Sequence, residues 1–69
     1  MTEQIAPHKL RMLYEQMELS LKTDKLEAFI SGNVFPTLPD DEQARLNRQL
    51  SAMRDYREVL RERLVAFTA

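Results

Sequence analysis

The chain contains no cysteine and no tryptophan, and it has one glycine and one histidine among its 69 residues. Without cysteine, disulfides and thiolate metal sites are excluded. A chain this short buries little of its surface and usually needs a disulfide, a metal or further subunits to be stable. The lone histidine, His8, does not build a zinc site by itself. Oligomerisation is therefore the expected source of additional stability.

Groups that perform enzyme chemistry are also scarce. His8 has no cysteine to pair with, and no serine and carboxylate are spaced to form a triad with it. The consecutive acids Asp40, Asp41 and Glu42 offer oxygen ligands for a divalent cation. A helix N-terminus explains them more simply, because negative charge there meets the helix dipole favourably. We expect no catalysis, no cofactor and no metal.

The charge is balanced, with ten Lys and Arg against eleven Asp and Glu and a net charge of −1. A general DNA or RNA binder would show a net basic surface, so this class is not expected. The opening MTEQIAPHKL has no basic stretch followed by an apolar core, unlike a secretory signal. No apolar run approaches the roughly 18 residues that span a bilayer. We expect a cytoplasmic protein that does not bind membranes.

The spacing predicts a first helix over residues 7–30, because Pro7 suits a first helical turn. Gly32 or Asn33 is expected to end it in a left-handed conformation. Residues 31–39 form a structured connector, since its two prolines cannot continue a helix interior. Three apolar side chains of the connector are expected to cover one end of the molecule: Val34, Phe35 and Leu38.

A second helix is predicted over residues 40–67, capped by Thr37 or Asp40. Its apolar residues follow spacings of three and four, as in a heptad seam, with one interruption at Arg57. The seam consists of Leu46, Leu50, Met53, Leu60, Leu64 and Phe67. These residues are expected to pack against one face of the first helix.

The first helix has two apolar faces at roughly 100° per residue. One face carries Leu10, Leu13, Tyr14, Met17, Leu21 and Ala28. The nearly opposite face carries Met12, Leu19, Leu26 and Ile30, with Phe29 beside them. One stripe suffices to meet the second helix of a hairpin, so the other needs a further cover. The predicted fold is an all-α antiparallel hairpin that assembles into a homo-oligomer, with a dimeric four-helix bundle favoured.

Two candidate sites follow from these patterns. The outward stripe is expected to be the interface with another copy or a partner, and it is assigned to Met12, Leu19, Leu26, Phe29 and Ile30. A pocket for a small anionic ligand between subunits is assigned to Arg54, Tyr56, Arg57 and Arg61. Arginine suits phosphate or carboxylate and also stacks on aromatic rings. The simpler interpretation is that Arg57 covers the core with its stem and pairs its head with an acid.

The segment KLEAFI, the Phe and Leu of the connector, and EQARLNRQLSAMRDYREVLRERLVAF resemble a group of short phage and prophage proteins described as crAss-phage-related. The matching positions are Lys25, Leu26, Phe29, Ile30, Phe35, Leu38, Glu42, Gln43, Leu46, Gln49, Met53, Tyr56, Val59, Leu60, Arg63, Leu64 and Phe67. The resemblance covers about residues 20–67. It implies a phage origin and an accessory role, and it brings no catalytic residues.

The leading functional hypothesis is a phage-encoded protein that oligomerises in the host cytoplasm, binds a host defence or regulatory protein stoichiometrically and blocks it. The small size, the absent catalytic groups and the surplus apolar surface motivate this hypothesis. The alternative is an oligomeric sponge that sequesters a nucleotide-type immune signal in the pocket assigned to the arginines and Tyr56. A structural role in the virion is a third possibility.

Overall fold

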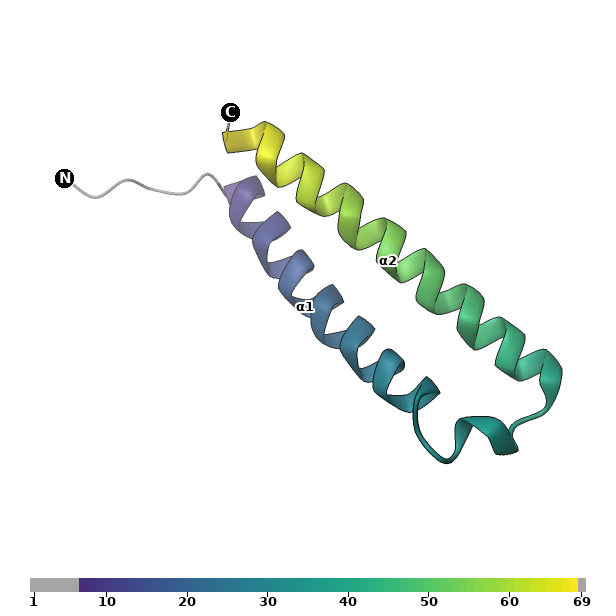
Figure 1. The fold of residues 1–69 in the computed structure, drawn as a ribbon. Helices are drawn as coiled ribbons and strands as arrows, with labels where there is room; N and C mark the ends of the chain where they lie inside the picture. The colour runs from purple at the N-terminus through teal and green to yellow at the C-terminus, as the bar shows by residue number, and fades with distance from the viewer. Residues whose placement is uncertain (1–6, 69) are drawn as a thin grey trace.

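The computed structural model describes residues 7–68, and two long helices lie side by side in it as an antiparallel hairpin (Figure 1). Helix α1 spans Pro7–Ile30 and helix α2 spans Asp40–Thr68, with a short 3-10 helix η1 at Phe35–Thr37 between them. These residues contain no strand, so the described part of the chain is all-helical as predicted. The expectation about the opening residues, which concerned the lack of a secretory signal, lies partly outside the described range.

Helix α1 ends without a left-handed residue. The Ser31 N–H donates to the Glu27 carbonyl at 3.0 Å, and the Gly32 N–H donates to the Phe29 carbonyl at 3.1 Å, so the last turn tightens. No residue between 7 and 68 has a positive φ, so the predicted left-handed conformation at Gly32 or Asn33 is wrong. A glycine suits position 32 because a side chain would be crowded there: an added Cβ would lie 3.3 Å from the Phe29 carbonyl oxygen.

The start of α2 is fastened to the connector by side-chain hydrogen bonds. The Gln43 amide donates to the Leu38 carbonyl at 2.9 Å and to the Pro36 carbonyl at 3.4 Å. Within the first turn of α2, the Asp41 carboxylate accepts the Glu42 N–H at 2.9 Å. The Thr37 hydroxyl instead donates to the Val34 carbonyl within η1, so Thr37 does not cap α2. Of the apolar connector residues, Phe35 and Leu38 are half-buried, as expected of an end cover. Val34 remains 56% exposed and does not cover the end.

The core is a single seam between the two helices. Its buried members are Met12, Leu19, Thr23, Leu50 and Leu60, and of these Thr23 and Leu60 are fully buried. The half-buried apolar residues along the same seam are Leu26, Ile30, Leu46, Met53 and Leu64. The predicted seam of α2 therefore packs on α1, although Phe67, its last member, is 39% exposed. The Thr23 hydroxyl is satisfied within α1, because it donates to the Leu19 carbonyl at 2.7 Å.

The two apolar stripes of α1 take the opposite places from those expected. The stripe that begins at Met12 and continues through Leu19 to Ile30 packs on α2 and is not outward-facing. The physical reason is length. This stripe extends from Met12 to Ile30 in the last turn, and a partner as long as α2 needs a stripe along most of α1. The other stripe is interrupted beyond Leu21, where Asp24 and Lys25 share its side of the helix.

Candidate functional site

An exposed apolar stripe lies on the side of α1 that faces away from α2. We call it the outer stripe, and it consists of Leu10 (52% exposed), Leu13 (39%), Tyr14 (59%), Met17 (54%) and Leu21 (58%). The stripe is about 17 Å long at 1.5 Å per residue. Contiguous exposed apolar patches larger than roughly a few hundred Å² mark interaction surfaces. The outer stripe is therefore a candidate contact surface for another chain.

Charged residues border one edge of the outer stripe. Its residues at positions 10, 14, 17 and 21 follow spacings of four, three and four, as the a and d positions of a heptad do. Arg11 and Glu18 then lie seven residues apart on the same edge and carry opposite charges. On the other edge, Leu13 and Ser20 carry no charge. The stripe thus has one neutral edge and one edge that alternates in sign.

The residues that the sequence assigned to the oligomer or partner interface lie mostly inside the hairpin. Met12 and Leu19 are each 8% exposed, and Leu26 and Ile30 are half-buried. Phe29 is 39% exposed and is the one member on the outside of the single chain. The surface available for an interface on α1 is therefore the outer stripe rather than this set.

The arginines of the predicted anionic pocket are held by carboxylates within the chain. The Arg54 guanidinium contacts the Glu27 carboxylate at 3.1 Å, and the Arg57 guanidinium lies 3.9 Å from the Asp24 carboxylate. Both pairs join α2 to α1. The Arg57 side chain is 33% exposed, which fits a stem that covers the core and a head that reaches an acid. These pairs give each of the two side chains a carboxylate partner on α1.

The remaining two members are held in the same way. The Arg61 guanidinium contacts the Glu58 carboxylate at 2.6 Å, which lowers the pKa of Glu58 and raises the pKa of Arg61. The Tyr56 hydroxyl donates to the Glu15 carboxylate on α1, and this hydrogen bond raises the pKa of Tyr56. Within one chain, each of the four residues is therefore paired with a different carboxylate.

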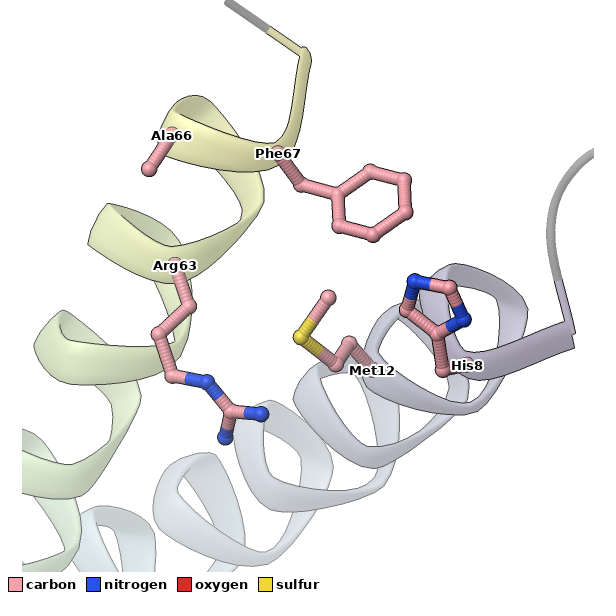
Figure 2. Close-up of a pocket in the computed structure, with 5 residues that line it drawn as sticks. All are labelled: His8, Met12, Arg63, Ala66 and Phe67. Carbon is pink, nitrogen blue, oxygen red and sulfur yellow. The ribbon is translucent and has the colours of Figure 1, made fainter.

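An open pocket that the sequence did not predict lies between the start of α1 and the end of α2 (Figure 2). Its volume is about 410 Å³, and it is lined by His8, Met12, Arg63, Ala66 and Phe67. The predicted antiparallel hairpin already brings the start of α1 near the end of α2, but the register that sets His8 against Phe67 comes from the structure. We call this pocket the open-end pocket.

Two ring contacts shape the open-end pocket. The His8 and Phe67 rings meet edge to face, with their centroids 4.6 Å apart and an angle of 68° between their planes. This geometry is favourable for aromatic pairs. The Lys9 ammonium lies 5.6 Å from the Phe67 centroid, within the range of a cation–π interaction. The pocket therefore combines an apolar wall, an aromatic ring and nearby cations.

The described residues limit the other kinds of site. No group of three or more His, Cys, Asp or Glu side chains among them is arranged to hold a metal ion. Neither α1 nor α2 is long and apolar enough to cross a membrane. What the structure offers is an exposed apolar stripe, charged flanks and one open pocket, which are features of a binding protein.

The fold and these surfaces define a small helical-hairpin binding protein. The model of the Sequestin family matches residues 6–66, which is nearly the whole chain, and the chain belongs to this family. No curated protein and no solved structure matches it.

Proposed function

We propose that this protein self-associates through the outer stripe and acts by sequestration, holding a partner in a stoichiometric complex without changing it chemically. The observation that carries the proposal is the outer stripe, in which five large apolar side chains lie 39–59% exposed on one side of α1. The name of the Sequestin family supports a sequestering role. A chain this short buries little apolar surface by itself, and a second copy that covers the outer stripe would add to that burial.

The pattern of the outer stripe favours an antiparallel pairing of α1 with α1 of a second copy. A two-fold axis near Tyr14 and Met17 places each of these residues opposite the other in the second copy, and it places Leu10 opposite Leu21. The apolar part of each stripe then overlaps completely. With α2 behind each α1, the dimer is a four-helix bundle.

Charge complementarity selects this register. The same two-fold axis brings Arg11 of one copy beside Glu18 of the other, and this pair occurs twice because the interface is symmetric. Opposite charges that flank an apolar seam set the partner and the orientation in coiled coils. On the other edge, Leu13 meets the uncharged Ser20. In this register, neither of these flanking pairs brings two like charges together across the interface.

A charge exchange tests the pairing. Arg11→Glu alone and Glu18→Arg alone each place like charges opposite one another and should weaken the dimer, whereas the double exchange should restore it. Dissociation constants from sedimentation equilibrium measure the effect, and Arg48→Glu, on the exposed side of α2, is the matched control. Single exchanges without effect, or a double exchange that does not recover, would contradict this register.

For the partner, we propose a host protein that a phage-encoded chain captures in the host cytoplasm and blocks by steric occlusion. The dimer leaves the flank of α2 uncovered, where Tyr56 is 42% exposed and Val59 is 50% exposed. Aromatic and arginine side chains are enriched in interface cores, and Arg63 lies on the same flank. The resemblance to short phage proteins supports the phage origin. The small size and the exposed apolar surface support the capture of a host defence or regulatory protein.

A nucleotide-type immune signal is the second candidate for what is sequestered. The observation that favours it is the charge of α2, since residues 45–63 carry six arginines against three acids. Assembly of two chains could bring Arg54, Tyr56, Arg57 and Arg61 of different copies around an anion. For this to happen, the ligand must replace the carboxylates that hold these side chains in the single chain.

Arg57→Ala separates the two candidates. A sponge should lose nucleotide binding while keeping its mass in solution, whereas a protein blocker should change mainly in stability. Isothermal titration with a mixture of nucleotides, with the mass checked by light scattering, measures both. The control is Arg45→Ala, because Arg45 is likewise paired with carboxylates but lies near the connector.

A further inference from the structure

The open-end pocket has the composition of a small-ligand site. Its volume of about 410 Å³ falls within the range of ligand pockets. Met12, Ala66 and Phe67 supply apolar and aromatic surface. Figure 2 shows the five lining side chains around one space between the last turns of α2 and the first turns of α1. A flat ring of one or two fused cycles fits such a wall.

The charged group that lines the open-end pocket is a cation. None of its five lining residues is acidic, and Arg63 contributes a guanidinium group. The Lys9 ammonium lies over the Phe67 ring at the rim, and the first turn of α1 contains no acid. Arginine binds carboxylate and phosphate through paired hydrogen bonds. A cationic group beside an exposed aromatic ring is complementary to a ligand that carries a ring and a negative charge.

We propose that the open-end pocket binds a small organic anion whose ring packs against Phe67 and Met12 and whose acid group meets Arg63. The site is distinct from the pocket predicted between subunits, since it lies within one chain. It deepens the second candidate function, on which it rests, by naming a place and a chemistry for a sequestered small molecule. The acid group is a phosphate or a carboxylate, and the affinities of 1-naphthyl phosphate and 1-naphthoate distinguish the two.

Four probes separate the contribution of the aromatic ring to binding from that of the negative charge. 1-Naphthyl phosphate and 1-naphthoate carry both, 1-naphthalenemethanol carries the ring alone, and inorganic phosphate carries the charge alone. Each probe is titrated into the full chain while NMR follows the ring signals of His8 and Phe67 and the methyl signal of Met12. We expect at least one aromatic anion to shift all three, with an affinity about tenfold or more above that of either single-feature probe.

Two variants then assign the acid group to Arg63. Arg63→Ala should weaken binding of the aromatic anion about tenfold or more, the loss expected for a charge-assisted hydrogen bond. Arg48→Ala removes an exposed arginine elsewhere on α2 and should leave the affinity within about twofold. Circular dichroism establishes that both variants stay helical, so that a loss of binding is not a loss of fold.

The results that would overturn ligand binding in the open-end pocket differ from those that would contradict self-association. Equal binding of 1-naphthalenemethanol and of the anions would overturn the proposal, because the pocket would then be an apolar surface only. Equal binding of inorganic phosphate, or unchanged binding by Arg63→Ala, would also overturn it. Leu21→Glu, designed to break the dimer, should keep binding because the pocket lies within one chain. A monomeric wild type that still binds the aromatic anion would therefore contradict self-association alone.

Discussion

The Tyr56 hydroxyl of α2 donates a hydrogen bond to the Glu15 carboxylate of α1, and this bond ties the two helices together on one flank of the hairpin. The bond raises the pKa of Tyr56, and burial and the charge of Glu15 act in the same direction. Arg63 opposes them by stabilising the phenolate. One phenol therefore reports on a contact between the helices.

Glu15→Gln should lower the pKa of Tyr56 towards the ordinary tyrosine value, and Arg63→Ala should raise it further. Because the pKa is raised in the folded state, the contribution of Tyr56 to stability is complete below the ordinary tyrosine pKa. It is lost as the pH rises through the folded value. Ultraviolet absorbance of the phenolate, in a Tyr14→Phe background that leaves Tyr56 as the sole tyrosine, measures the shift. Identical titrations with and without Glu15 would refute the bond.

Leu60 is the fully buried apolar residue of α2, so its truncation should be costly. Leu60→Ala should lower the free energy of unfolding by about 2–5 kcal/mol, the usual cost of losing a buried leucine. Val59→Ala, at the neighbouring exposed position, should change it by about 0.5 kcal/mol or less. Urea denaturation followed by circular dichroism checks both. Equal effects would show that the seam does not pack as described.

Thr23 occupies a fully buried position where α1 meets α2. Its hydroxyl bonds only to the Leu19 carbonyl of its own helix among the described contacts, so a methyl group can take its place. Thr23→Val should lower the free energy of unfolding by no more than the net worth of one hydrogen bond, about 0.5–1.5 kcal/mol, whereas Thr23→Leu should lower it by about 1–3 kcal/mol through overpacking. Thermal unfolding of the two variants measures the difference. A destabilised Thr23→Val beside a tolerated Thr23→Leu would indicate a looser crossing with a required hydroxyl.

The hairpin was predictable because several local patterns agreed. Spacings of three and four predicted the seam of α2, and Leu50 and Leu60 are buried as that seam requires. The break at Arg57 was also informative, since the structure gives it a half-exposed stem and a carboxylate partner in Asp24. In each case, apolar spacing within one helix decided the outcome.

Choosing between the two stripes of α1 required information that hydrophobicity alone does not carry. Both stripes contain large apolar residues, and the inner one is interrupted by Gln16 and Thr23. The stripe that packs on α2 is set by its length along the helix, because Leu26 and Ile30 extend the inner stripe to the last turn whereas Asp24 and Lys25 cut the outer stripe short. The open-end pocket was missed for a related reason. His8 and Phe67 are distant in sequence, and their contact depends on how the two helices are aligned along each other.

A charge placed in the outer stripe should abolish self-association without unfolding the chain. Met17→Glu would put a carboxylate at the centre of the symmetric interface, opposite Tyr14 and close to its own copy, and removing it from water is costly. Ser51→Glu, on the exposed face of α2, is the control and should remain oligomeric. Size-exclusion chromatography with circular dichroism checks both variants. A Met17→Glu protein that elutes like the wild type would exclude the outer stripe as the interface.

In the proposed assembly, the outer stripe is covered by a second copy of the chain. Absolute mass from light scattering across a protein dilution series tests it most directly, because the subunit mass is 8.1 kDa and each oligomer differs from the next by that amount. The antiparallel pairing predicts twice the subunit mass, or a larger even multiple if dimers associate further, falling towards the subunit mass only on strong dilution. A folded chain that stays at 8.1 kDa at every concentration would contradict it.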